Sequence, residues 1–288
     1  TEISNNKTVL PPERRGIGMV FQDYALFPHL TLWKNVCFGI KKKSSVERIH
    51  WLLELLGLNN FIERYPHELS GGQRQRLAFA RALAPGNSIV LLDEPFNSLD
   101  IQVRMRLRME LPEVLKTFSA TGIFVTHDSQ EALSICDRIA VMQKGKLHQC
   151  ASPEELAEDP STSFVGEFVF QRNIFPITFK DNRLFTPLGK YSLSFNSFSI
   201  TPKYLMFDSG SLELDFTSTP NAIIKSKEYT YSTWIITVKY NDYLIRVSYP
   251  IDKSVKVGQL CNLSFKANQQ VILFPGCHKA KLSAMQAN

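Results

Sequence analysis

Several features are scarce in this 288-residue sequence, and each scarcity excludes a class of protein. There is no run of about 18 apolar residues, the length that a helix needs to cross a bilayer. The first six residues have neither the basic start nor the apolar stretch of a secretion signal. The five cysteines are scattered and not at metal-ligand or redox spacing. We therefore expect reduced thiols rather than a disulfide framework or a metal site.

The remaining composition is that of a globular protein with room for two domains. Hydrophobic residues make up 44% of the chain and charged residues 21%, which are ordinary values. The net charge of +6 is uneven, because residues 171–288 contain 14 Lys and Arg against 7 Asp and Glu, whereas residues 1–170 contain 19 against 20. A basic segment can meet nucleic acid or an anionic membrane. Its lysines are dispersed, however, which favours a solvated surface.

Alternating strands and helices predict a parallel α/β sheet in the first part of the chain. Branched apolar runs bounded by turn residues are typical of strands buried on both faces, and such runs occupy residues 16–21, 88–92 and 122–126. Helices are expected at residues 32–57 with a charged break at 41–43, and at 60–65, 70–84, 101–119 and 129–136.

Polar side chains follow each of these three strands. Gln22 follows the first, Asp93 and Glu94 the second, and His127 the third. Open α/β sheets bind ligands at the carboxyl ends of their strands, and adjacent carboxylates after an apolar strand are costly unless they bind something. Asp93 and Glu94 therefore indicate a metal-phosphate site, with a salt bridge as the alternative. His127 alone suits a structural histidine, but beside the other two strand ends a functional role is favoured.

The sequence Leu69-Ser70-Gly71-Gly72-Gln73 predicts the start of a helix. Ser70 is a good N-cap because its hydroxyl can accept a hydrogen bond from an amide of the first turn. The two glycines leave amide groups exposed at the positive end of the helix dipole, which suits a phosphate. A capped surface helix is the alternative for these residues taken alone.

Together these motifs resemble ABC-type ATPases in order and spacing, over nearly all of residues 8–170. The resemblance implies an α/β, P-loop NTPase-like ABC cassette with a parallel sheet and a helical subdomain. It implies that ATP and Mg²⁺ are bound, and it assigns a role to each motif. Gln22 would be the Q-loop residue, which coordinates Mg²⁺ or positions water, and Asp93 would hold the Mg²⁺ ion. Glu94 would be the general base, and His127 would contact the γ-phosphate. The signature would consist of Ser70, Gly71, Gly72 and Gln73, and Asp100 would be the D-loop residue.

From residue 171 onward the sequence changes to short segments rich in Phe, Ile, Val, Thr and Tyr. These predict a small all-β barrel. The region resembles the OB-like regulatory domain of importer ATPases, with Thr201-Pro202-Lys203 where such domains often carry a basic-Pro-acidic segment. The expected domains are an ABC ATPase domain at 1–170 and an OB-like regulatory domain at 171–288.

Within the superfamily the chain is similar to importers fed by a periplasmic binding protein. Residues 110–112 and 124–128 look most like the iron(III) branch, although polyamine, sulfate and sugar importers share much of this pattern. The apolar loop that begins at Tyr24 and ends at Leu32 is expected to dock a membrane permease; folding back on the core is the alternative. The family also implies a peripheral position on the cytoplasmic face of the inner membrane.

No Gly-x-x-x-x-Gly-Lys-Ser/Thr phosphate loop occurs in the 288 residues. The family places this loop upstream of Gln22, so we expect that the N-terminal part is missing from the sequence. A natural non-catalytic regulatory subunit is the alternative. In the family two copies enclose ATP head to tail, so the signature is expected to act on ATP held by a second copy. No nucleic-acid partner is expected, because the basic region shows no clear instance of aromatics interleaved with Lys and Arg on one face.

Overall fold

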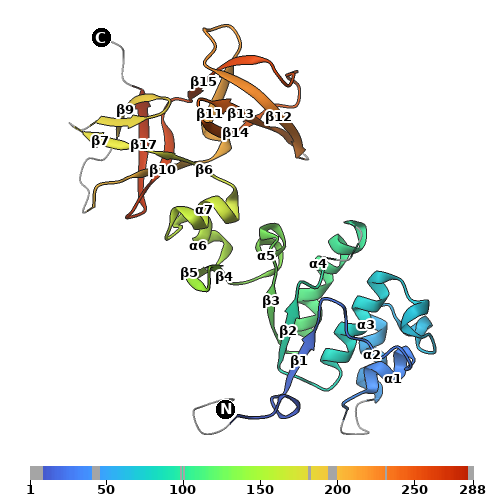
Figure 1. Cartoon of the computed structure of the whole chain (residues 1–288). Coiled ribbons are helices and arrows are strands. Elements are labelled where there is room, and N and C mark those ends of the chain that lie inside the picture. Colours follow the sequence, from blue (N-terminus) through green and yellow to red (C-terminus); the bar gives the residue numbers. More distant parts are fainter. Residues whose placement is uncertain are drawn as a thin grey trace. The chain divides into compact units, whose positions relative to one another are not determined.

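The computed structural model describes residues 9–40, 46–97, 99, 101–180, 183–193, 200–230 and 232–284. The chain divides into two compact units, Thr1–Cys136 and Asp137–Asn288, each with its own elements (Figure 1). Among the described residues no helix combines the length and the apolar character needed to span a bilayer.

A parallel sheet forms the centre of the first unit, as the sequence predicts. Its strands are β1 (Ile17–Val20), β2 (Ile89–Asp93) and β3 (Thr121–Val125), in the order β1-β2-β3. The register pairs Val20 with Leu92 and Asp93 with Val125. The carboxyl ends of all three strands therefore lie along one edge of the sheet.

The described part of the first unit also contains five α-helices. They are α1 (Leu32–Cys37), α2 (Val46–Leu55), α3 (Gly71–Leu83), α4 (Ile101–Thr117) and α5 (Ser129–Ile135). Of these, α3 contacts β1 and α4 contacts β3. Short 3₁₀ turns complete the unit, namely η1 (Pro12–Arg14), η3 (Asn59–Phe61) and η4 (Pro66–Glu68).

The helix expected at residues 60–65 is wrong, because η3 and η4 replace it. Pro66 opens η4, and the residue before a proline is biased away from the helical conformation. The carbonyl oxygens of Ile62 and Arg64 also accept hydrogen bonds from Trp33 and Leu32 at the start of α1, at 3.0 and 2.8 Å. These carbonyls are thus committed to a distant segment rather than to a local helix.

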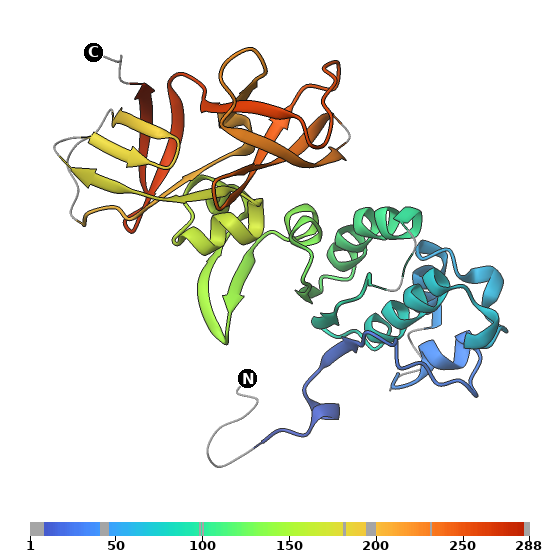
Figure 2. The same cartoon turned by 45° about the horizontal axis from the view of Figure 1, so that its top comes forward.

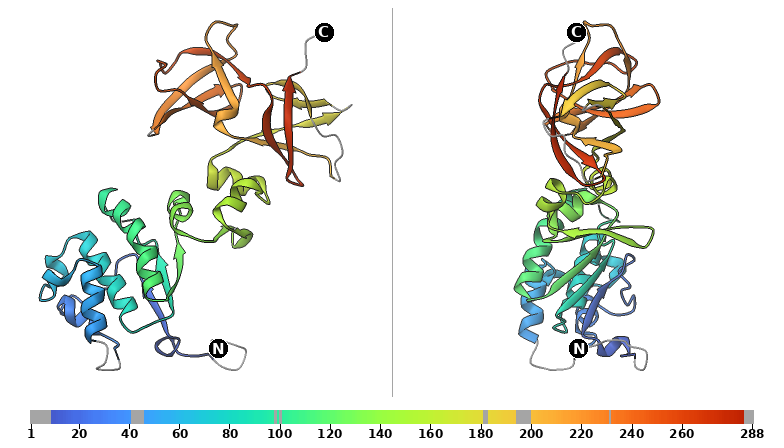
Figure 3. Two further views of the ribbon diagram at one scale, coloured as in Figure 1. Left: turned by 180° about the vertical axis from the view of Figure 1, so that it is seen from behind. Right: turned by 90° about the vertical axis from the view of Figure 1, so that its left-hand side faces the viewer.

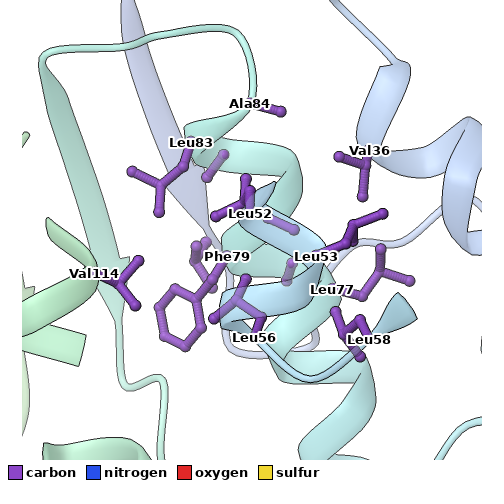
Figure 4. Packing of buried hydrophobic residues seen from close by; sticks show 14 of the residues in the cluster. Val36, Leu52, Leu53, Leu56, Leu58, Leu77, Phe79, Leu83, Ala84 and Val114 are labelled. Carbon is purple, nitrogen blue, oxygen red and sulfur yellow. The ribbon is translucent and has the colours of Figure 1, made fainter. Parts of the chain in front are cut away.

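Helix α3 is the centre of the hydrophobic core of the first unit (Figure 4). Leu77 and Leu83 are almost completely buried and pack among side chains of α2, with Val36 of α1 and Val114 of α4 nearby. The helix also lies close to β1, because a Cβ atom at Gly18 would be 2.5 Å from the carbonyl oxygen of Ala82. Gly18 therefore allows the signature helix to approach the sheet.

Strand β3 is less buried than its apolar sequence predicts. Ile123 and Val125 are 52% and 56% exposed, so the expectation of a strand buried on both faces is wrong here. The reason is its place in the sheet, because β3 is the edge strand of the described three-stranded order.

The second unit begins with a hairpin and two helices. The hairpin consists of β4 (Ile139–Gln143) and β5 (Lys146–Ala151) and is drawn in lime in Figure 2. The helices are α6 (Pro153–Glu158) and α7 (Ser163–Phe170). Helix α7 contacts β6 and β10 of the following β-rich region.

The β-rich region is confirmed, but its strands form two sheets rather than one barrel (Figure 3). One sheet has seven strands, in the order β6 (Asn173–Pro176), β10 (Tyr204–Phe207), β16 (Gln269–Phe274), β17 (His278–Ala284), β9 (Gly189–Leu193), β8 (Arg183–Thr186) and β7 (Thr178–Lys180). The other has five, in the order β11 (Leu212–Asp215), β15 (Leu260–Phe265), β12 (Ala222–Thr230), β13 (Thr233–Tyr240) and β14 (Tyr243–Tyr249). A single hydrophobic cluster includes residues of both sheets. Apolar alternation shows which residues are buried but not which distant strands pair.

Candidate functional site

Four of the predicted site residues lie at the carboxyl ends of the strands of the parallel sheet. Gln22 is exposed in the turn that follows β1, and Asp93 is the exposed last residue of β2. Glu94 follows Asp93 directly, and His127 comes two residues after the end of β3. Because β1, β2 and β3 are parallel, residues more than 100 positions apart in the sequence share this edge.

The closest contact within this group joins Glu94 and His127. Oε1 of Glu94 lies 3.1 Å from Nδ1 of His127, and the histidine side chain is 69% exposed. Nδ2 of Asn97 donates a second hydrogen bond to Oε2 of the same carboxylate. The imidazole and the carboxylate are thus brought together at the surface, where a ligand can reach both.

An unusual backbone conformation directs the Glu94 side chain. Glu94 has a φ of +43°, in the left-handed region that non-glycine residues seldom occupy. Its amide donates a hydrogen bond of 2.9 Å to the carbonyl of Val125, which extends the pairing of β2 and β3 by one residue. Such strain persists only where the surrounding structure fixes it. The turn therefore fixes the Glu94 carboxylate beside the end of β3.

A network of charged residues fixes the segment that carries His127. Asp128 caps α5 by accepting hydrogen bonds from Gln130 and Glu131. Arg108 of α4 donates to Asp128 at 3.2 Å and to Glu131 at 2.8 Å, and the Glu131 side chain is only 3% exposed. Hydrogen bonds to buried charged groups are among the stronger ones. Sequence reasoning missed Arg108 and Glu131, because an Arg in an alternating Arg-rich helix carries no signal of its partner.

The signature helix α3 begins as predicted, with Ser70 as its N-cap. The Ser70 hydroxyl accepts a hydrogen bond from the Gln73 amide at 3.3 Å, and the Ser70 amide donates to Oε1 of Gln73 at 2.8 Å. This reciprocal pair is a capping box. Gly72 has a packing role as well, because a Cβ atom there would lie 2.6 Å from Cγ1 of Val103 on α4.

Gln75 connects the signature helix to the turn that contains Glu94. It is completely buried, and its Nε2 donates a hydrogen bond to the carbonyl oxygen of Pro95. Sequence reasoning did not select Gln75. The available signal is its helical spacing, since Gln75 lies on the same face as the buried residues Ala78, Phe79 and Ala82, where a polar residue needs a partner.

Arg76 of α3 donates hydrogen bonds to the carbonyl oxygens of Gly72 and Leu56, and burial lowers the pKa of its guanidinium.

The apolar loop of residues 24–32 is held rigidly by two side chains. The buried Asn35 accepts a hydrogen bond from the amide of Phe27 and donates to the carbonyls of Phe27, Leu30 and Thr31, all at 2.9–3.1 Å. Arg81 of α3 donates to the carbonyls of Tyr24 and Ala25, and burial lowers its pKa. The loop is therefore fixed to α1 and α3, with Phe27 half-buried in contact with Phe38.

Oxygen donors suited to a divalent cation are available at this edge. Mg²⁺ prefers oxygen ligands and is usually held by one or two carboxylates together with phosphate and water. The exposed Asp93 carboxylate and the exposed Gln22 side chain are of this type, so the residues present fit such an ion. Asp100, the expected D-loop residue, lies outside the described residues.

Comparison with known proteins shows what this part of the chain is similar to. Residues 2–97 match the family model described as ABC transporter. The chain is 47% identical over 173 residues to the spermidine/putrescine import ATP-binding protein PotA of Trichormus variabilis, an alignment that covers 58% of this chain and 45% of that protein.

Two further relatives are named as ATP-binding proteins for the import of other solutes. The Fe(3+) ions import ATP-binding protein FbpC 2 of Rhizobium meliloti is 46% identical over 174 residues, covering 59% of this chain and 44% of that protein. The sulfate/thiosulfate import ATP-binding protein CysA of Halalkalibacterium halodurans is 44% identical over 188 residues, covering 62% and 52%. The chain thus spans about half the length of the curated relatives that it matches.

A solved structure of cbiO1 from Clostridium perfringens, described as part of the ABC transporter complex cbiONQ, also matches. It covers 50% of this chain and 59% of that chain at 31% identity, with a TM-score of 0.46.

Proposed function

We propose that this chain belongs to the ATP-hydrolysing subunit of an importer that moves a solute across the cytoplasmic membrane. The contact between Glu94 and His127, beside Asp93 at the carboxyl edge of a parallel sheet, is the observation that carries this proposal. Hydrolysis of a nucleoside triphosphate needs a residue that orients the attacking water and groups that stabilise the phosphate. A half-buried carboxylate in contact with an exposed imidazole supplies both kinds of group.

In this proposal Glu94 is the general base and His127 holds the γ-phosphate. The Glu94 carboxylate accepts a proton from the attacking water, and Asn97 keeps the carboxylate in place through Oε2. The exposed His127 ring donates a hydrogen bond to a phosphate oxygen. A bound Mg²⁺ ion would neutralise phosphate charge, with Asp93 and Gln22 as its protein ligands.

The signature at the start of α3 acts on ATP held by a second copy of the chain. Ser70 and the amides of Gly71 and Gly72 are placed at the positive end of a 13-residue helix, which suits a phosphate. The capping box engages the Gln73 side chain, so Gln73 is proposed to shape this helix start as well as to lie near the nucleotide. Asp100 is proposed to take part in the same dimer contact.

The rigid loop of residues 24–32 is proposed to dock the permease subunits, which in turn receive solute from a periplasmic binding protein. Tyr24 and Leu32 anchor the loop in the core, and the partly exposed Phe27 and Leu30 between them are held by hydrogen bonds with the buried Asn35. This would place the chain on the cytoplasmic face of the inner membrane. Residues 1–170 are proposed as the ATPase domain and residues 171–288 as a regulatory domain built on the two β-sheets.

Iron(III) is proposed as the solute, on the resemblance of residues 110–112 and 124–128 to the iron branch. Relatives named for polyamine, iron(III) and sulfate import are 47%, 46% and 44% identical, so overall identity does not separate these solutes. A polyamine, sulfate or sugar importer is the alternative.

The test is stimulation of ATP hydrolysis by a loaded binding protein in the intact importer that contains this chain. Iron-loaded binding protein should stimulate hydrolysis, whereas spermidine-loaded and sulfate-loaded proteins should not. Stimulation by either of the latter would replace iron by that solute. If the importer still transports solute when Glu94 is replaced, the chain is better interpreted as a non-catalytic regulatory subunit.

A further inference from the structure

The turn that carries His127 is tied to one buried carboxylate. This turn consists of Thr126, His127 and Asp128 and joins the end of β3 to the start of α5. The carboxylate belongs to Glu131, whose side chain is only 3% exposed. The His127 side chain is 69% exposed, so packing contributes little to the position of its ring. The ring is therefore placed by the backbone of the turn and by the contact with Glu94.

Glu131 holds the residue that precedes His127. Its Oε2 accepts a hydrogen bond of 2.7 Å from the hydroxyl of Thr126. The oxygen of the same hydroxyl accepts a hydrogen bond of 3.0 Å from the amide of Asp128. A hydroxyl group can donate one hydrogen bond and accept others, so Glu131 orients the Thr126 hydroxyl and that hydroxyl closes the turn across His127.

Arg108 of α4 holds Glu131 and the residue that follows His127 at the same time. Its Nη2 donates to Oε1 of Glu131 at 2.8 Å and to Oδ2 of Asp128 at 3.2 Å. Hydrogen bonds between charged groups are the shorter and stronger ones. Both carboxylate oxygens of Glu131 are thus engaged by neighbouring side chains, so this residue acts on the turn rather than on a nucleotide.

We propose that Glu131 is a positioning residue for ATP hydrolysis, which, with Arg108 and Thr126, sets the turn so that the His127 ring meets Glu94 and the γ-phosphate. This inference rests on the proposed function, in which His127 holds that phosphate. A buried ion pair is on balance no more stabilising than well-packed apolar side chains, so what it adds here is a fixed geometry. Supporting contacts hold a reacting group in place, and a displacement of about 1 Å can cost about 10²-fold in rate.

Steady-state ATP hydrolysis by the intact importer that contains this chain measures the effect. Thr126→Val removes the hydroxyl and keeps the shape of the side chain, so kcat should fall by about tenfold or more, with a smaller change in KM for ATP. Thr126→Ser keeps the hydroxyl and should retain most of the rate. Glu131→Gln removes the charge that Arg108 faces and should behave like Thr126→Val. Glu154→Gln, the same change at an exposed position of α6, should hydrolyse ATP normally.

The ring of His127 gives a second measurement that does not depend on activity. In the 288-residue chain with ¹⁵N-labelled histidine, the Nδ1 resonance of His127 reports the contact with Glu94. This resonance is assigned by its loss in His127→Ala. It should move in Thr126→Val and in Glu131→Gln in the same direction as in Glu94→Gln, and it should stay in place in Thr126→Ser and Glu154→Gln.

The two measurements separate this inference from the proposed function. The inference is overturned if the His127 resonance stays in place in both Thr126→Val and Glu131→Gln, or if it moves while kcat stays normal. It is also overturned if Thr126→Ser loses as much activity as Thr126→Val, because the hydroxyl would then not be the group that matters. Normal hydrolysis by His127→Ala would instead remove His127 from its proposed role, even where the resonance shows that Glu131 sets the position of the ring.

Discussion

The buried side chain of Gln75 on α3 donates a hydrogen bond to the carbonyl oxygen of Pro95, the residue that follows Glu94. This bond joins the signature helix to the turn that presents the Glu94 carboxylate. Any shift of α3 therefore acts on that turn through one buried contact.

Replacing Gln75 with Leu tests this connection. The substitution leaves the Pro95 carbonyl without its donor, which costs about 1–2 kcal/mol of unfolding free energy. We expect the ATPase rate to fall more than ATP affinity, because the position of Glu94 is loosened while the phosphate contacts remain. Urea unfolding and steady-state kinetics measure the two effects. Gln102→Leu, at an exposed position of α4, should change neither; equal effects of both variants would argue against the connection.

Gly72 is expected to be required for packing as well as for its amide group. In Gly72→Ala the new methyl group would approach Cγ1 of Val103 to 2.6 Å, and overpacking of this kind costs about 1–3 kcal/mol. The double variant Gly72→Ala with Val103→Ala should recover part of the loss, as measured by thermal unfolding. Gly210→Ala, where a Cβ atom meets nothing within 4 Å, serves as the control. This role would be contradicted if the double variant lost as much stability as the two single variants lose when their losses are added.

Asn35 is expected to control the shape of the apolar loop. Asn35→Ala removes four hydrogen bonds to the loop from a completely buried side chain and should cost about 3 kcal/mol. Hydrogen exchange of the amides in residues 26–31 should become faster. Asn59→Ala, at an exposed site, is the control. Unchanged exchange in Asn35→Ala would show that other contacts fix the loop.

The thiol of Cys277 is expected to react slowly with alkylating reagents. Burial, together with a hydrogen bond of 2.9 Å to Oδ1 of Asp159, raises the pKa of Cys277 to about 12. The thiol therefore stays protonated in the folded state above pH 9, where an unfolded thiol ionises. Its contribution to stability is present below the unfolded pKa and is lost as pH rises toward 12.

Mass spectrometry of iodoacetamide labelling at pH 9 measures this effect. Asp159→Asn should lower the pKa of Cys277 and accelerate labelling several-fold, whereas Asp242→Asn, at an exposed turn, should not. Rapid labelling of Cys277 in the unmodified chain at pH 9 would show that its thiol is not held in the protonated form.

Much of the first unit follows from local sequence signals. The parallel sheet and the start of α3 are predicted because apolar runs, turn residues and an N-cap serine are local in the sequence. The exposure of β3 was not predictable in this way, because burial depends on which strands pair with it. The same reason explains why the β-rich region was predicted as one barrel but contains two sheets.

The contacts within the candidate site could not be predicted from the sequence. Glu94 and His127 were selected from the ends of two strands, and the structure brings them together. The supporting residues Gln75, Arg108 and Asn35 were missed. Each is a polar residue within a helix whose partners lie elsewhere in the chain, so its role becomes visible only when the tertiary contacts are known.

The measurement that tests the proposed function most directly is ATP hydrolysis by Glu94→Gln in the intact importer that contains this chain. Glutamine keeps the size of the side chain but cannot accept the proton from water, so the rate should fall by about 10²-fold or more while ATP binding persists. Glu113→Gln, at an exposed position of α4, should hydrolyse ATP normally. Near-normal hydrolysis by Glu94→Gln would contradict the assignment of Glu94 as the general base.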